Sequence, residues 1–155
     1  MSTNLLPSFR KAFQFSRAWR SPPSMLRESE VLIPVGEGVG TIPGTIIRPE
    51  GSETRGWIVL HGMTRLGRAH PELVRFVKAL ASTGASVLVP EIREWTELEF
   101  APRRAQEILR GAVDWLYRSP AIKPGGIMVA GLSFGAPQAL FAAADIELGR
   151  KIRGV

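Results

Sequence analysis

The chain has 155 residues, of which 45% are apolar and 22% charged, and it contains no cysteine. This size and composition are ordinary for one globular domain, and no apolar run approaches the roughly 20 residues that cross a bilayer. The lack of cysteine excludes disulfides and thiolate metal sites, and it fits a reducing, cytoplasmic location.

The net charge of +6 is concentrated at the N-terminus. Residues 1–27 hold five basic side chains and no acidic one, while residues 28–155 hold fifteen basic and fourteen acidic side chains. The second part is therefore close to neutral, which argues against a nucleic-acid partner. We divide the chain into a basic N-terminal arm, residues 1–27, and a domain over residues 28–155.

The arm carries apolar residues at helical spacing, namely Leu5, Leu6, Phe9, Phe13 and Trp19. Two interpretations are open. The basic and apolar mixture is typical of peripheral membrane contact or of a transit segment. Alternatively, the arm is a helix or tail that packs on the domain.

Two strands are predicted first in the domain, over residues 30–35 and 41–48. The segment Gly36–Gly40 between them is glycine-rich, like a dinucleotide-binding loop, but no helix follows that could hold a pyrophosphate. It is therefore interpreted as a hairpin turn. Pro43 predicts an edge position or a bulge for the second strand, because proline cannot donate a ladder hydrogen bond.

Strands and helices then alternate. Short apolar runs predict buried strands, and apolar residues at helical spacing predict helices between them. Residues 91–100 are predicted to be a polar loop, and residues 150–155 to lead into a further strand. Right-handed crossovers then give an α/β fold, a mostly parallel sheet flanked by helices with an antiparallel beginning. The three buried strands are expected at residues 56–60, 85–90 and 127–131.

The third buried strand ends in Gly131-Leu132-Ser133-Phe134-Gly135, and a helical pattern follows at once. A serine at the apex of such a strand–turn–helix lies on a strained backbone with its hydroxyl exposed. The glycines on either side permit the close approach of strand and helix.

These residues resemble the α/β-hydrolase superfamily, in a dienelactone-hydrolase-like or esterase-like form. Three features match in order: a strand ending in His61-Gly62, a strand ending in Val89-Pro90-Glu91, and the Gly-x-Ser-x-Gly turn. The resemblance covers about residues 30–155 and corresponds to the N-terminal half of that fold.

The resemblance implies a serine hydrolase that acts on an ester or related acyl substrate through an acyl-enzyme, with no cofactor. Ser133 is then the nucleophile, and the backbone amides of Met63 and Phe134 form the oxyanion hole, with Thr64 as an alternative to Met63. The glycines that shape the elbow and the loop are Gly62, Gly131 and Gly135.

Other polar residues near these motifs receive weaker assignments. His61 precedes the serine, whereas the family's base follows it, so a structural role is expected. His70 is expected to be a capping or surface residue. Arg65 and Arg68 could meet an anionic substrate, but solvated surface charge is the expectation. Glu91 lies at a strand tip, where the family commonly has an acid.

The catalytic acid and the catalytic histidine that the family has downstream of the serine are not found after Ser133. Asp145 and Glu147 are the acids that follow it, and no histidine does. Asp145 lies about twelve residues after Ser133, at the end of the following helix, which carries it roughly 15 Å away, too far to orient a base. We therefore expect a truncated hydrolase with little activity alone and an exposed sheet edge that favours dimerisation. The alternative is a non-catalytic interaction or membrane-associated module that keeps the hydrolase scaffold.

Overall fold

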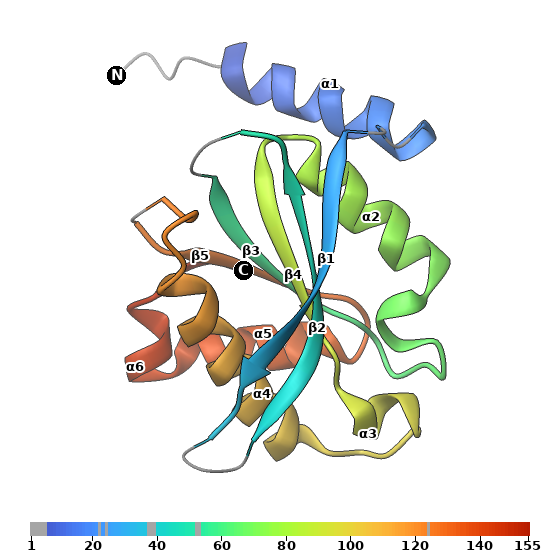
Figure 1. The fold of residues 1–155 in the computed structure, drawn as a ribbon. Helices are drawn as coiled ribbons and strands as arrows, with labels where there is room; N and C mark the ends of the chain where they lie inside the picture. The colour runs from blue at the N-terminus through green and yellow to red at the C-terminus, as the bar shows by residue number, and fades with distance from the viewer. Residues whose placement is uncertain (1–5, 22, 24, 37–39, 52–53, 124) are drawn as a thin grey trace.

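A computed structural model describes residues 6–21, 23, 25–36, 40–51, 54–123 and 125–155 (Figure 1). A six-stranded sheet lies between helices, as the sequence predicts. The elements in chain order are α1 (Leu6–Arg20), β1 (Leu26–Pro34), β2 (Thr41–Pro49), β3 (Arg55–Leu60), η1 (Gly67–Ala69), α2 (Pro71–Ala81), β4 (Ala85–Pro90), α3 (Arg93–Thr96), α4 (Pro102–Tyr117), β5 (Ile127–Gly131), α5 (Gly135–Ala144), α6 (Ile146–Gly149) and β6 (Ile152–Gly154).

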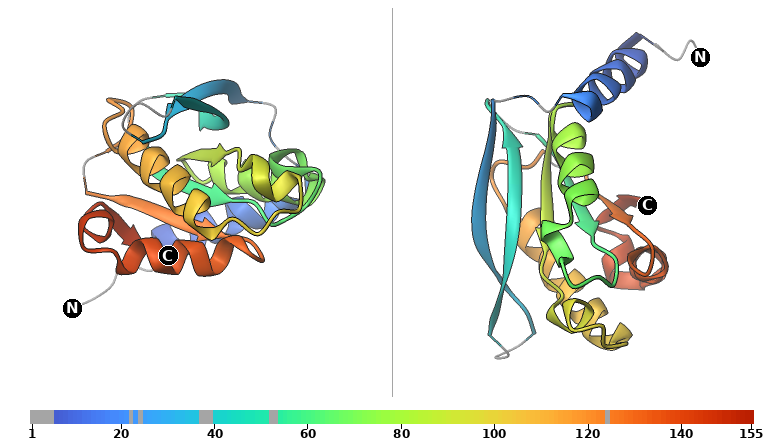
Figure 2. Two further views of the ribbon diagram at one scale, coloured as in Figure 1. Left: turned by 90° about the horizontal axis from the view of Figure 1, so that it is seen from below. Right: turned by 90° about the vertical axis from the view of Figure 1, so that its right-hand side faces the viewer.

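The strand order across the sheet is β1-β2-β4-β3-β5-β6. The β1–β2 and β2–β4 pairs are antiparallel, and the pairs among β4, β3, β5 and β6 are parallel. The antiparallel hairpin therefore forms one side of the sheet, and the parallel strands form the other (Figure 2). Both the parallel sheet and its antiparallel beginning are confirmed. Residues 37–39 of the predicted hairpin turn, and Leu5 of the arm, lie outside the described residues.

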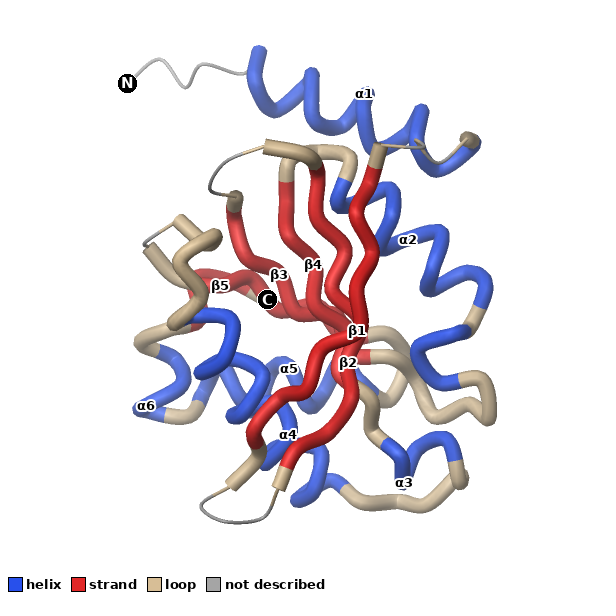
Figure 3. Tube along the Cα trace, viewed as in Figure 1, coloured by secondary structure: helices blue, strands red, loops and turns tan. Residues whose placement is uncertain are grey.

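Helices cover both faces of the sheet (Figure 3). The alternation of side chains along each strand divides the core in two. In β3, Ile58 and Leu60 join a cluster with α4 and α5, whereas Val59 joins a cluster with α2. All six residues of β4 are buried. Burial on both faces explains the continuous apolar runs that predicted these strands.

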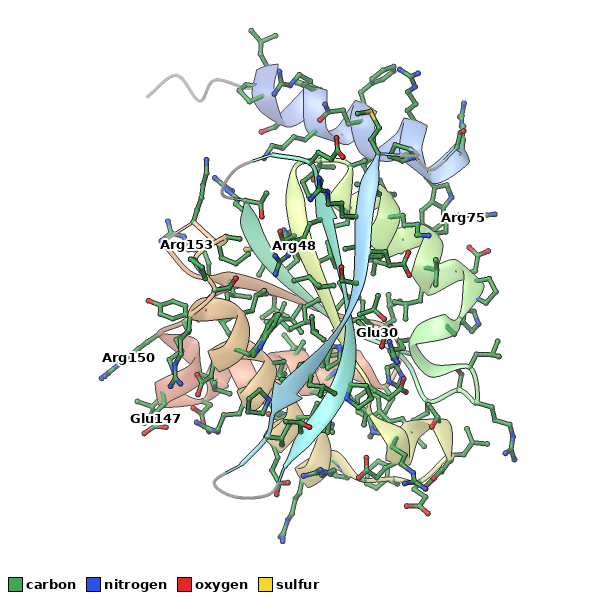
Figure 4. All side chains as sticks on the ribbon, viewed as in Figure 1. Glu30, Arg48, Arg75, Glu147, Arg150 and Arg153 are labelled. Carbon is green, nitrogen blue, oxygen red and sulfur yellow. The ribbon has the colours of Figure 1, made fainter. Side chains whose placement is uncertain are left out.

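The N-terminal arm forms α1, which packs against α2. Phe15 of α1 meets Phe76 of α2 edge to face, with ring centroids 5.8 Å apart, and it stacks on Trp19 at 6.1 Å. Arg75 of α2 lies over the Trp19 ring, 5.7 Å from its centroid (Figure 4). One face of the arm is thus docked on the domain.

Two expectations about strands need correction. β1 begins at Leu26 rather than at residue 30, because its first residues pair with the end of β2. β2 is an interior strand rather than an edge. Pro43 is tolerated there because it lies beyond the last β2–β4 pair, Gly44 with Pro90. The carbonyl of Pro43 accepts the Glu91 amide at 2.9 Å, so the missing N–H faces the side where β4 has ended.

The predicted polar loop over residues 91–100 contains the short helix α3. Ile92 and Trp95 of this segment are fully buried. Their side chains fill the core cluster beneath α4, and this packing orders a segment that is otherwise polar.

The predicted strand near the end of the chain is confirmed as β6, but its pairing is short. Two residue pairs, Ile127 with Ile152 and Met128 with Gly154, join it to β5. The strand that carries the Gly-x-Ser-x-Gly turn is therefore fully paired with β3 and only briefly paired on its other side.

Candidate active site

Ser133 lies in the turn between β5 and α5, and its φ is +52°. Positive φ costs a non-glycine residue about 1–2 kcal/mol. The turn is held by two backbone hydrogen bonds: the Gly135 amide donates to the Leu132 carbonyl at 2.9 Å, and the Ala136 amide donates to the Ser133 carbonyl at 3.0 Å. The predicted strained serine between strand and helix is therefore present.

The two glycines of the motif allow this close packing. A Cβ on Gly131 would overlap the carbonyl group of Gly135. A Cβ on Gly135 would lie 2.9 Å from Cβ of Leu60 and 3.0 Å from the carbonyl oxygen of His61. Neither position has room for a side chain. The first turn of α5 consequently packs directly on the end of β3.

The turn places its three central residues in different surroundings. Leu132 packs on the α2 side of the sheet, and Phe134 packs on the α4 side. The Leu132 amide also donates to the Leu60 carbonyl at 3.0 Å, which extends the β5–β3 ladder. Ser133 therefore sits at the sheet edge between the two cores.

The loop after β3 reaches the serine, as expected for the carboxyl ends of neighbouring parallel strands. A Cβ on Gly62 would lie 3.3 Å from Cβ and 3.9 Å from Oγ of Ser133. Met63 follows and packs, half-buried, against the core cluster that includes Phe134. Among the described residues, the amides of Met63 and Phe134 donate no backbone hydrogen bond.

His61 is almost completely buried, and both of its ring nitrogens are bonded to backbone. Nδ1 lies 2.8 Å from the Gly62 carbonyl, and Nε2 accepts the Ile92 amide at 3.1 Å. These partners assign the proton to Nδ1 and leave the imidazole neutral. Burial lowers the pKa of His61, although the Gly62 carbonyl bond and the Glu91 charge oppose the shift. The ring fixes the loop to β4 and has no free nitrogen to act as a base.

Arg68 does not behave as the solvated surface charge that we expected. Its side chain is 21% exposed, as is that of Glu91. Nε donates to Oε2 of Glu91 at 2.6 Å, and Nη1 donates to Oε1 of Glu30 at 2.6 Å and to the Thr45 hydroxyl. Hydrogen bonding from Arg68 lowers the pKa of Glu30. Arg65 is exposed, in keeping with the expectation for that residue.

Aromatic residues that the sequence did not single out pack behind the turn. The ring centroid of Trp95 lies 5.1 Å from that of Phe134 and 5.5 Å from that of His61. Phe100 covers the other side of Phe134 at 5.1 Å. Trp95 thus packs against both the loop after β3 and the serine turn. An apolar pair at positions 92 and 95 was the available signal.

A cavity of about 320 Å³ opens beside Ser133. Trp19 of the arm lines this cavity, and so does His70. His70 occupies the N-cap position of α2, one of the two roles predicted for it, although its side chain makes no capping hydrogen bond. The complete lining is Trp19, His61, Gly62, Thr64, Gly67, His70, Glu72, Leu73, Phe76, Leu132 and Ser133.

The acids downstream of the serine have structural partners. Oδ1 of Asp145 caps α6 by accepting the amides of Glu147 and Leu148 at 3.0 and 2.9 Å. Its Oδ2 accepts a bond from Arg110 at 2.9 Å. The Leu148 amide bond is the main cause of a lowered pKa for Asp145. Asp145 therefore stabilises a helix end and orients no base.

Within the described ranges, no three His, Asp or Glu side chains gather closely enough to bind a metal ion. None of the helices in these ranges combines the length and the apolar character needed to cross a membrane.

No protein-family model and no curated protein sequence matches this chain. Solved structures do. A dienelactone hydrolase from Anabaena variabilis is 26% identical with a TM-score of 0.68, over 83% of this chain and 61% of that protein. The esterase Est22 gives 19% identity and a TM-score of 0.73, over 99% and 51%. The α/β-hydrolase GrgF from Penicillium gives 22% identity and a TM-score of 0.65, over 79% and 43%.

This chain thus spans between 43% and 61% of the length of these three structures. The Ser133 turn follows β5, which lies between β3 and the short strand β6. The chain therefore has an α/β-hydrolase-like fold.

Proposed function

We propose that this chain carries the nucleophile and oxyanion half of a serine hydrolase that acts on an ester or related acyl substrate. The observation that supports the proposal best is the backbone of Ser133 at φ +52°, with Gly62 packed against it. The similarity to a dienelactone hydrolase and to an esterase agrees with a hydrolase.

In the proposed reaction, Oγ of Ser133 attacks the acyl carbonyl carbon and gives its proton to a base. The negative charge that develops on the carbonyl oxygen is bound by the amides of Met63 and Phe134. Backbone donors of this kind are worth about 3 kcal/mol each in the transition state. The leaving alcohol departs, an acyl-enzyme forms, and water releases the acid.

Neither His61 nor Asp145 can supply the base in this scheme. Both nitrogens of His61 are bonded to backbone, and Asp145 caps a helix. The chain alone is therefore expected to have little triad-type activity. A serine hydroxyl without a neighbouring base is a weak nucleophile at neutral pH.

The test is labelling of Ser133 by a small alkyl fluorophosphonate, with imidazole added as an external base. We expect slow labelling without imidazole and at least a tenfold faster reaction with it, in the wild type and not in Ser133→Ala. His70→Gln is the control for the other histidine of the cavity.

Two results would contradict the proposal in different ways. If imidazole produces no adduct on Ser133, the serine is not a nucleophile. If labelling is stoichiometric without imidazole, the chain already contains a base, and the His70→Gln variant reports whether His70 supplies it.

A second candidate is the membrane-associated module, and the outer face of α1 favours it. Leu6, Phe9 and Phe13 are 78%, 69% and 68% exposed on this helix. Basic side chains flank them, at Arg10, Lys11, Arg17 and Arg20. Such a face suits the surface of an anionic bilayer.

Co-sedimentation with vesicles that contain anionic lipid tests this candidate. Phe9→Ser with Phe13→Ser should reduce binding at least fivefold. Leu140→Ser with Phe141→Ser is the matched control, because these α5 residues are similarly exposed, at 61% and 64%, on another helix. Equal binding of both variants would exclude α1 as the membrane contact.

A further inference from the structure

The cavity beside Ser133 has a wall that comes from outside the parallel sheet and its loops. Trp19 of α1 lines it together with Leu73 and Phe76 of α2 and with Leu132 of the serine turn. These four side chains are apolar or aromatic. Gly62 and Ser133 line the same space, so a group bound there lies next to the serine hydroxyl.

Trp19 is held in place by its neighbours. Its ring stacks on Phe15, and Phe15 meets Phe76 edge to face. The guanidinium of Arg75 lies over the Trp19 ring at 5.7 Å. Aromatic and cation–π contacts of this kind each contribute on the order of 1 kcal/mol. The Trp19 indole is therefore held in position before a ligand binds.

The charges around the cavity disfavour an anionic ligand. No lysine or arginine lines it among the residues that the structure describes. Two nearby cations have partners already: Arg68 is engaged by Glu30 and Glu91, and Arg75 lies over the Trp19 ring. Glu72 lines the cavity, is 60% exposed and lies 3.5 Å from Arg75. A carboxylate in this space would lose its hydration without gaining a positive partner.

We propose that the cavity is a subsite for an uncharged apolar group, a short alkyl chain or a single aromatic ring, and that Trp19 determines its specificity. A volume of about 320 Å³ holds a group of that size. The assignment of this group to the acyl or alcohol part of a substrate rests on the proposed function of Ser133. Binding in the cavity does not.

The test is therefore a binding measurement with unreactive probes. The neutral ketone 4-phenylbutan-2-one is compared with 3-phenylpropanoate, a carboxylate of the same shape, by titration in ¹H–¹⁵N NMR spectra. We expect the ketone to shift the amides of Gly62 and Ser133 and to bind at least tenfold more tightly than the carboxylate.

Substitutions at two positions of α1 test whether Trp19 forms the cavity wall. Trp19→Ala should weaken ketone binding at least fivefold, and Trp19→Phe should give an intermediate affinity. Phe13→Ala is the matched control, because Phe13 is an exposed aromatic residue of α1 that does not line the cavity. It should leave the affinity unchanged.

Intermolecular NOEs keep the proposal testable if Trp19→Ala perturbs the docking of α1. In the wild type, the phenyl protons of the ketone should show NOEs to the rings of Trp19 and Phe76. NOEs confined to other sites, equal affinity for the carboxylate, or wild-type affinity in a folded Trp19→Ala protein would each overturn the subsite.

Ketone binding and imidazole-dependent labelling of Ser133 test the subsite and the proposed function separately. Failure of imidazole-dependent labelling with intact ketone binding would contradict the nucleophile and leave the subsite standing. The reverse pattern would contradict the subsite alone.

Discussion

Nε of Arg68 donates a 2.6 Å hydrogen bond to Oε2 of Glu91, and this contact joins the loop after β3 to the end of β4. The same guanidinium reaches Glu30 on β1, a residue labelled in Figure 4. Since Arg68 also bonds the Thr45 hydroxyl on β2, one side chain ties the loop that passes Ser133 to β1, to β2 and to the end of β4. Since His61 also binds the Ile92 amide, the loop has two separate attachments beside Glu91.

Loss of the Arg68 attachment should destabilise the fold. Arg68→Ala is expected to lower the free energy of unfolding by about 1–3 kcal/mol, between the values for exposed and buried pairs. Urea denaturation measures it. Arg93→Ala is the control, because Arg93 makes an equally short bond to Glu97, 2.7 Å, while 83% exposed. It should have no measurable effect, and similar losses in both variants would contradict the attachment.

The pKa of His61 predicts a pH dependence of stability. Burial lowers this pKa below the ordinary value of 6.5, so the unfolded chain takes up a proton before the folded one does. Stability from this group is complete above pH 6.5 and falls as the pH drops below it, by at most about 1.4 kcal/mol per pH unit. Denaturation at pH 7.5 and 5.5 should show a smaller difference in His61→Gln than in the wild type. Equal differences would show that His61 is not the group responsible.

The glycines near Ser133 differ in how much room a methyl group would have. Gly131→Ala should cost about 3 kcal/mol or more, because the new Cβ overlaps the backbone of Gly135. Gly62→Ala should cost less than about 1.5 kcal/mol, since its Cβ would meet Cβ of Ser133 at 3.3 Å and a small shift relieves the contact. Chemical denaturation gives both values. The reverse order would contradict the described packing.

The strained backbone of Ser133 predicts that glycine is more stable there than alanine. Ser133→Gly and Ser133→Ala both remove the hydroxyl, but only glycine adopts φ +52° without steric cost. We expect Ser133→Gly to be more stable than Ser133→Ala by about 1 kcal/mol in thermal or urea unfolding. If alanine is equally stable, the residue is not strained in solution.

The parts of the fold that follow from local patterns could be predicted. Buried runs such as residues 56–60 and 85–90 have one dominant cause, burial on both faces, and the sequence records it directly. The approach of Gly62 to Ser133 also follows, because the carboxyl ends of parallel strands share one edge of a sheet. Glycine is required at positions 131 and 135 for the predicted reason, since a Cβ at either position would clash with the backbone.

The other features of the fold and the site depend on tertiary contacts that produce no periodic pattern in the sequence. Arg68 and Glu91 are 23 residues apart, and nothing local distinguishes them from solvated charges. Trp95 lies in a four-residue helix, too short to show a helical period.

The prediction that Trp19 shares one helical face with the other apolar residues of the arm was wrong. Leu6, Phe9 and Phe13 are exposed, whereas Trp19 packs with Phe15 and Arg75. The position of Trp19 in the cavity depends on how α1 docks on α2. Pro43 wrongly predicted an edge position for β2, because the order of strands in a sheet depends on tertiary contacts.

The strand order has a consequence for the sequence of events during synthesis. The strands β1 to β4 lie within residues 26–90 and pair with one another, so a four-stranded sheet can form before β5 leaves the ribosome. One rim of that early sheet is β3, whose Leu60 carbonyl later receives the Leu132 amide. Until residues 127–132 emerge, this apolar rim is open to other chains. The strand β5, which leads into the Ser133 turn, therefore also covers the exposed edge of β3 in the nascent sheet.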